Sequence, residues 1–319
     1  MANRSYTKGL HDLGNDLYAY LQPDGSWGWA NAGLVVDGEA TLLIDTLYDL
    51  KLTGEMLDTM RRAVPAAAQI GTVVNTHANG DHCYGNQLVA GAEIIASART
   101  AEEMTSGVTP AVMAMMMQQA PNMGQLGAYL RRIFGPFAFE NITFTPPNRT
   151  FEGEVTLNVG SKTVQLLEVG PAHTKGDTMA YLPAERVIFT GDILFIGGHP
   201  IIWAGPTSNW LRACDRILAL DVETIVPGHG PLTDKKGVAE LKGYLEYVYQ
   251  EARQRFDAGM PASEAARDIP LDRYATWLDG ERIAVNVASM YREFSGEQEP
   301  ANVLTLMGLM AALAQERGA

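Results

Sequence analysis

The chain has 319 residues, 46% of them hydrophobic, and is therefore long enough to bury a sizeable core. Its net charge is 24 − 37 = −13, and an acidic surface repels phosphate backbones, which argues against nucleic acid as a partner. No apolar run reaches the roughly 20 residues of a membrane span, and the first residues lack the apolar stretch of a signal peptide. We therefore expect a soluble, cytoplasmic protein with no membrane partner.

The first hundred residues alternate short apolar runs with turn residues. These runs predict five strands, at 16–21, 33–36, 41–44, 70–75 and 92–96. Apolar residues recur every four positions from Leu52 to Val64, which predicts a helix that ends before Pro65.

The middle of the chain first becomes helical and then returns to strands. Residues 98–140 are rich in methionine and are expected to form a helical insert. Further strands are predicted at 154–159, 163–168, 179–182, 186–190 and 224–226. A helix over 211–220 precedes the last of these strands.

The last part, 233–319, is expected to be a helical extension packed on the same body. Thr233 or Asp234 is a candidate cap of its first helix, and further helices fit 281–294 and 301–316. Because strands, a helix and strands again recur along the chain, we expect two sheets packed face to face with helices outside. This is an α+β, four-layer αβ/βα sandwich.

Potential metal ligands gather where predicted strands end. They are His77, Asp81, His82, His173, Asp192 and His229. The first three lie in Thr76-His-Ala-Asn-Gly-Asp-His82, directly after the strand at 70–75, and each of the others also follows a strand. Imidazole and carboxylate ligands in this number suit Zn²⁺, with Fe²⁺ or Mn²⁺ as alternatives.

This order of residues resembles the metallo-β-lactamase superfamily. The family motif His-x-His-x-Asp-His, followed by a lone His, an Asp and a final His, stands here as His77-x-Asn79-x-Asp81-His82, His173, Asp192 and His229. The resemblance spans about residues 10 to 232. It implies that 1–319 form one domain of this fold. It further implies one metal position at His77, residue 79 and His173, and a second at Asp81, His82 and His229, with Asp192 bridging both.

Asn79 departs from the family pattern, which has a histidine at this position. An amide oxygen is a weaker Zn²⁺ ligand than imidazole, so the first metal position is expected to be weak, empty or used by a substrate group. We therefore predict one tightly bound metal at Asp81, His82 and His229, with two metals as the alternative. A structural alternative is that Asn79 caps a helix that begins near Asp81.

The predicted chemistry is hydrolysis. A metal-bound water has its pKa lowered to ~7, and Asp81 or Asp192 could orient it and accept its proton. This chemistry suits an ester, thioester, lactone or lactam of a small molecule, and the resemblance implies the same reaction class. The alternatives are a lyase, cyclase, isomerase or redox enzyme that uses the altered site, or a binding protein without catalysis.

Six further residues are candidates for contact with a substrate. They are Trp27, Trp29, Met113, Met117, His199 and Trp203. Aromatic clamps and adaptable methionines favour an apolar or aromatic substrate, and the methionine-rich insert could act as its lid. The structural alternative is that a tryptophan packs inward, that the insert packs on the core and that His199 is an ordinary core residue.

Two further expectations concern the state of the cysteines and the packing of the tail. Cys83 and Cys214 are too few for a disulfide framework and are expected to be free thiols, with Cys83 a small buried residue beside the site. Apolar residues of the tail, such as Val303 and Leu304, can bury against the body or against a second chain. A homodimer is thus an open alternative.

Overall fold

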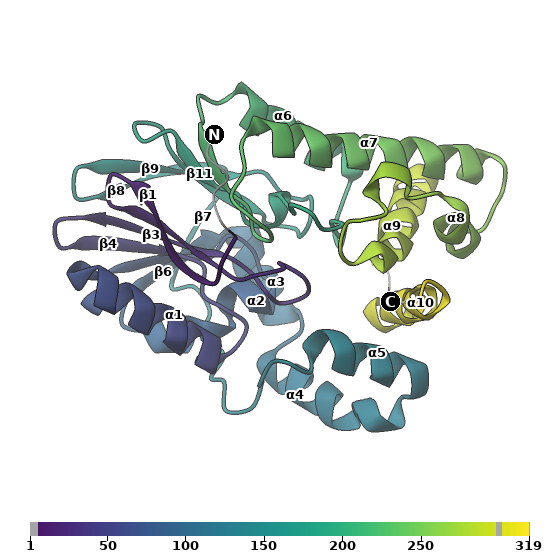
Figure 1. The fold of residues 1–319 in the computed structure, drawn as a ribbon, viewed down its shortest axis with the longest axis horizontal. Helices are drawn as coiled ribbons and strands as arrows, with labels where there is room; N and C mark the ends of the chain where they lie inside the picture. The colour runs from purple at the N-terminus through teal and green to yellow at the C-terminus, as the bar shows by residue number, and fades with distance from the viewer. Residues whose placement is uncertain (1–5, 298–301, 319) are drawn as a thin grey trace.

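The computed structural model describes residues 6–297 and 302–318, and within them two β-sheets lie face to face with helices on both outer sides (Figure 1). The first sheet contains, in spatial order, β1 (Gly9–Gly14), β2 (Leu17–Leu21), β3 (Ala32–Asp37), β4 (Ala40–Ile44), β5 (Thr72–Val74), β6 (Glu93–Ser97) and β7 (Arg149–Phe151). The second contains β12 (Thr224–Val226), β11 (Val187–Phe189), β10 (Thr178–Leu182), β9 (Lys162–Glu168) and β8 (Glu154–Val159). The expected αβ/βα sandwich is confirmed.

The sheets are held together by alternate apolar side chains on their inner faces. Leu17, Ala19 and Leu21 of β2 share one buried cluster with Val164 and Leu166 of β9. Because side chains of a strand alternate between faces, the residues between them point to the outer helices. The outer face of the second sheet is covered only in part, since Glu154, Thr156 and Asn158 of β8 are exposed.

One helical layer covers each sheet. Helix α1 (Leu50–Ala63) begins at Asp49, whose Oδ1 accepts from Leu52 N at 2.7 Å, and it buries Met56 and Met60 against the first sheet. Helix α6 (Thr207–Ala219) covers the second sheet, and α7 (Lys235–Asp257) packs on α6. Asp234, not Thr233, caps α7 by accepting from Lys236 N at 2.7 Å.

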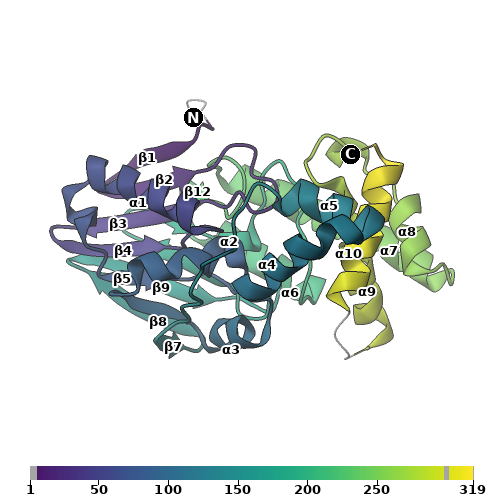
Figure 2. The same ribbon diagram turned by 90° about the horizontal axis from the view of Figure 1, so that it is seen from below.

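The remaining helices form a body at one end of the sandwich (Figure 2). They are α4 (Pro110–Gln119), α5 (Gly124–Phe134), α8 (Ala262–Asp268), α9 (Ile283–Ser295) and α10 (Val303–Glu316), whereas α3 (Ala98–Ser106) packs on β6 and β7 of the first sheet. Helix α10 packs against both α5 and α9. Glu281 ties the tail to the insert because its Oε1 accepts from Tyr129 at 3.1 Å and from Arg132 at 2.9 Å. No described helix is long and apolar enough to cross a membrane.

Two strands and several helix ends differ from the sequence expectation. Strands β1 and β7 were not predicted, because their residues are polar or partly exposed and show no clean apolar alternation. Both lie at the edges of the first sheet, where one neighbour is missing. Helix α6 begins at Thr207 rather than at Leu211, directly after Pro206.

Candidate metal centre

The six predicted ligands meet at one end of the sandwich, around the carboxylate of Asp192. Its Oδ1 lies 3.1 Å from His82 Nε2, and its Oδ2 lies 3.3 Å from His173 Nε2, 3.4 Å from His229 Nε2 and 3.7 Å from His77 Nε2. Asp81 Oδ2 lies 3.3 Å from His229 Nε2. All six residues are buried.

The donor atoms fall into two overlapping groups that could each hold a cation. Asp81, His82 and His229 offer one group, and His77, His82 and Asp192 offer the other, with ligand atoms within 4.8 Å of one another in each. Three atoms that face this centre are buried and have no hydrogen-bond partner among the described residues: His77 Nε2, His82 Nε2 and Asp192 Oδ1. Because buried polar atoms are nearly always paired, a divalent cation fits this donor set.

Asp45 orients two of the histidines from the Nδ1 side of their rings, opposite the Nε2 atoms that face the centre. His82 donates from Nδ1 to Asp45 Oδ2 at 2.8 Å, which turns its Nε2 lone pair toward the centre. His77 donates from Nδ1 to Thr76 Oγ1 at 3.0 Å, and Thr76 Oγ1 donates to Asp45 Oδ2 at 2.7 Å. One buried carboxylate thus fixes the ring of His82 directly and that of His77 through a hydroxyl. Asp45 itself has φ 62°, a left-handed conformation.

Asn79 contacts His173 and does not act as a helix cap. It precedes α2 (Gly80–Cys83), but its side chain accepts no backbone N–H there, so the capping alternative is wrong. His173 donates from Nδ1 to the carbonyl oxygen of Ile201 at 2.7 Å, so the lone pair of its ring is on Nε2. Asn79 Nδ2 lies 2.9 Å from that Nε2 and donates to it. The amide therefore occupies the atom that His173 would offer to a metal.

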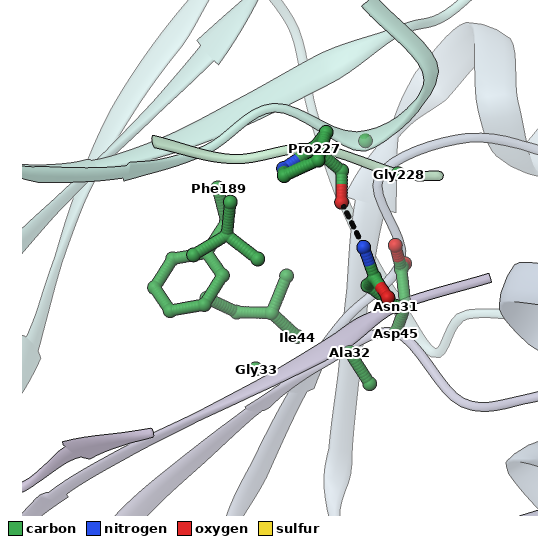
Figure 3. Close-up of a pocket in the computed structure, with 10 residues that line it drawn as sticks. Asn31, Ala32, Gly33, Ile44, Asp45, Phe189, Pro227 and Gly228 are labelled. Atoms are coloured by element: carbon green, nitrogen blue, oxygen red, sulfur yellow. Dashed lines mark hydrogen bonds between the residues drawn. The ribbon is translucent and has the colours of Figure 1, made fainter. Parts of the chain in front are cut away.

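Hydrogen bonds from Asn31, which directly precedes β3, hold the loop that carries His229 against the first sheet. Asn31 donates from Nδ2 to the carbonyl oxygens of Pro227 at 3.0 Å and Gly230 at 2.8 Å, and Figure 3 shows the contact with Pro227 beside a water-sized space. Gly228 is required here, because a Cβ at this position would lie 2.0 Å from Asp192 Oδ1. The ring of Phe195 stacks on His229 with an interplanar angle of 4° and centroids 5.1 Å apart.

The buried carboxylates and imidazoles at the centre shift one another's pKa values. Burial raises the pKa of Asp81, but the charges of His82 and His229 outweigh it and lower that pKa to about 2. The four histidines likewise hold the pKa of Asp192 well below its usual range against its burial. Burial lowers the pKa of His77 and His173. Both carboxylates are thus ionised, and His77 and His173 are neutral. The neighbouring carboxylates outweigh burial at the other two rings: they raise the pKa of His82, and that of His229 to about 9, so these two imidazoles would release a proton on binding a metal.

A cavity of about 490 Å³ opens on this centre. Asn79, Asp81, His173, Asp192 and His229 form its polar wall. The other walls are largely apolar, and they include Trp27, Tyr48, Tyr84, Met113, Met116, Phe134, Phe195, Trp203 and, from α10, Val303, Leu304, Leu306 and Met307. Pockets of this size and composition hold small organic molecules.

The candidate substrate residues divide between this cavity and the core. Trp27, Met113 and Trp203 line the cavity, and their contact with a substrate stays a prediction. Trp29 instead packs on Phe137, with ring centroids 5.0 Å apart. Met117 also lies outside the lining of the cavity. Its neighbour Met116 lines the cavity instead, together with Met113.

His199 belongs to the core rather than to the cavity mouth. It is fully buried, its Nε2 bonds to the carbonyl oxygen of Tyr274 at 3.1 Å, and its ring meets Tyr244 edge-on. Burial lowers its pKa to about 3, so it is neutral. Cys83 is also buried, and burial raises the pKa of its thiol, which leaves it unsuited as a nucleophile.

Sequence reasoning missed Asp45, Phe195 and Arg282. Asp45 carried a usable signal, because it directly follows a predicted strand, as the other site residues do. Phe195 and Arg282 carried none, since an apolar residue and an arginine have no spacing that marks them for a cavity wall. Arg282 reaches the site from the tail through the packing of α9 and the turn before it.

The sequence profile of the Metallo-beta-lactamase superfamily matches residues 26–229. The chain is 33% identical over 141 residues to the 2,4-dinitroanisole O-demethylase subunit alpha of Nocardioides sp. (strain JS1661), a match that covers 44% of this chain and 38% of that protein. It is 32% identical over 92 residues to a hydroxyacylglutathione hydrolase of Brucella ovis, with 29% and 35% covered. The chain thus spans well under half the length of these curated relatives.

Solved structures show the same fold at low sequence identity. The stereoselective inverting sec-alkylsulfatase Pisa1 from Pseudomonas sp. has a TM-score of 0.68 at 17% identity, over 98% of this chain and 56% of that one. A metallo-beta-lactamase from Pontibacter korlensis has a TM-score of 0.55 at 18% identity, over 75% of this chain and 99% of that one. The second likeness is confined to part of this chain, whereas the first extends over nearly all of it.

Proposed function

Since the chain belongs to the metallo-beta-lactamase superfamily, we propose that it is a metal-dependent hydrolase of a small apolar or aromatic substrate, acting on an ester, thioester, lactone or lactam. One observation carries the proposal: a cluster of buried histidines and carboxylates forms one wall of a cavity whose other walls are largely apolar. Reactive groups and room for an apolar molecule thus meet in one place.

We assign one tightly held metal, Zn²⁺ in the first instance, to Asp81, His82 and His229. Two imidazoles and a carboxylate are a donor set that zinc enzymes use, and Fe²⁺ or Mn²⁺ would accept the same atoms. His77 and His173 with Asn79 make the weaker position, because the amide of Asn79 donates to His173 Nε2. Asp192 lies within reach of both positions.

A metal held at this site would lower the pKa of a water to ~7 and polarise the bond to be cleaved. Asp192 and Asp81 are ionised, so either carboxylate can orient the attacking water and accept its proton. Trp27, Trp203 and Met113 contact the apolar body of the substrate and exclude bulk water from the reacting atoms.

A second candidate is cleavage of an aromatic methyl ether. It is favoured by the aromatic residues of the cavity, such as Trp27, Phe134 and Trp203, and by the similarity to an O-demethylase subunit. Water would add oxygen to the ring carbon and release methanol, so that no oxidant is needed. Non-hydrolytic reactions of other classes have no comparable support.

The test is a panel of aryl and alkyl esters, thioesters, lactones, lactams and one methyl aryl ether, assayed with zinc-loaded protein. We expect turnover of at least one class, lost on chelation and lost in Asp81→Ala, while Asp58→Ala on the exposed face of α1 retains it. Turnover that persists in Asp81→Ala, or that chelators leave unchanged, would contradict the proposal.

A further inference from the structure

Three cationic side chains line the cavity outside the metal centre: Lys175, Arg282 and Arg292. Apart from Asp81 and Asp192, Glu103 is the one carboxylate among the lining residues. Outside the metal centre the wall thus has three cations and one carboxylate, whereas the chain as a whole has a net charge of −13. Such a wall attracts an anion into the cavity.

Arg282 is already engaged within the protein. Its Nη2 lies 3.0 Å from Asp279 Oδ2, and its Nη1 donates to the carbonyl oxygen of His199 at 2.9 Å. The guanidinium lies over the ring of Trp27, 4.3 Å from its centroid. Arg282 therefore has a structural role in the cavity wall, and its charge is largely compensated by Asp279.

Arg292 and Lys175 are not compensated in this way. Neither side chain forms an ion pair with a carboxylate of the described residues, and Arg292 Nε is buried without a hydrogen-bond partner there. Glu103 accepts the backbone N–H of Lys175 at 3.0 Å, and the Lys175 charge acts on the pKa of Glu103, but the ammonium and this carboxylate form no ion pair. A partly buried guanidinium without an acceptor is unfavourable, and an anionic ligand would relieve it.

Lys175 and Arg292 lie in two segments that both bond to the stretch of chain carrying Trp203. The backbone N–H groups of Trp203 and Ala204 donate to the carbonyl oxygen of His173, two residues before Lys175, at 3.0 and 3.1 Å. A few residues on, Thr207 N donates at 2.9 Å to Glu293, the neighbour of Arg292. The segment 203–207 thus connects the loop of Lys175 with the helix of Arg292.

We propose that the cavity binds an amphiphilic anion, with an apolar or aromatic body and an oxyanion group held by Arg292 and Lys175 beside Trp203. A guanidinium binds a carboxylate or sulfonate with two parallel hydrogen bonds, and an ammonium adds a point charge. The exposed apolar residues Val112, Val303 and Leu304 at the cavity lining suit the entry of the apolar body. The inference rests on the proposed function in that it names the substrate class of the same site.

Two fluorescent probes with the same aromatic body test the charge directly: anilinonaphthalene sulfonate, an anion, and phenylnaphthylamine, which is neutral. Binding is measured on the full chain, both zinc-loaded and metal-free. We expect Arg292→Gln combined with Lys175→Gln to raise the Kd of the sulfonate about 10-fold or more, because hydrogen bonds to charged groups are lost. The Kd of the neutral probe should stay within about twofold.

Control variants separate the effect of the charges at the cavity from the effect of its apolar wall on probe binding. Arg131→Gln combined with Lys51→Gln removes two exposed cations elsewhere and should change neither affinity. Trp203→Ala should weaken both probes, because it removes part of the wall that both contact. An unchanged sulfonate affinity in the Arg292/Lys175 variant, an equal loss for both probes, or no effect of Trp203→Ala would each overturn the inference.

The metal-free measurement keeps this test independent of the proposed reaction. If the charge effect appears there but no substrate is hydrolysed by zinc-loaded protein, the anion site stands and the hydrolase proposal fails. If hydrolysis is found but the charge effect is absent, the hydrolase proposal stands and the anion site fails.

Discussion

At the scale of single residues, the metal centre depends on side chains that do not themselves face the metal position. Asp45 holds His82 directly and His77 through Thr76, so one carboxylate sets the direction of two imidazole rings. The carbonyl oxygen of Ile201 does the same for His173. His229 differs, since its Nδ1 is buried without a partner among the described residues and its ring is held by stacking on Phe195.

Asp45→Asn should weaken metal binding without removing a ligand. An amide is a poorer acceptor for His82 Nδ1–H, and loss of such a partner typically lowers metal affinity 10–100-fold, so a decrease of roughly that size is expected. Zinc affinity is measured by competition with a chromophoric chelator, with Asp58→Asn as the exposed control. An affinity equal to that of the wild type would show that Asp45 does not position His82.

Gly228→Ala should displace Asp192, because the added Cβ would lie 2.0 Å from Asp192 Oδ1. We expect most of the bound metal to be lost while the fold is kept, as checked by metal analysis and circular dichroism. Gly91→Ala is the matched control, since a Cβ there meets nothing within 4 Å. Full metal content in Gly228→Ala would contradict the central place given to Asp192.

The residues around the site were predictable to different degrees. Each metal-ligand candidate follows an apolar strand, so a metal site at strand ends could be predicted from the residues, and the family resemblance implied how they divide between two metal positions. The contact of Asn79 with His173 could not, because it joins residues 94 positions apart through a side-chain orientation. The same holds for His199, whose place in the core depends on aromatic neighbours from 244 and 274.

At the scale of elements, strands with clean alternation were predictable and polar edge strands were not. Strand β8 matches its predicted bounds at 154–159 because buried and exposed residues alternate along it. Strand β7 consists of three polar or partly exposed residues and depends on pairing with β6. Its formation is set by a partner strand rather than by its own sequence.

Helix α1 should contribute much of the stability of the first sheet. Met56 is fully buried between this helix and the sheet, so Met56→Ala should lower the free energy of unfolding by about 2–5 kcal/mol. Met115 on α4 is 57% exposed, and Met115→Ala should change it by less than about 0.5 kcal/mol. Urea denaturation measures both, and equal losses would contradict the packing described here.

At the scale of the whole molecule, the cavity joins parts of the chain that are far apart in sequence. The sandwich supplies the metal-ligand candidates and part of the apolar wall, such as Trp27 and Phe195, and the insert and the tail complete that wall through α4 and α10. Val303 and Leu304, which the sequence left open between the body and a second chain, lie exposed at the cavity lining. Sequence periodicity predicted the helices, but not the cavity that they enclose, because a cavity depends on how several elements meet.

The central claim is that one metal is held tightly, at Asp81, His82 and His229, because Asn79 weakens the second position. The direct measurement is the metal content of zinc-loaded, dialysed protein by mass spectrometry. We predict about one ion per chain in the wild type, and about two in Asn79→His, since an imidazole replaces the amide as a ligand. Two tightly held ions in the wild type, or an unchanged content in Asn79→His, would contradict the claim.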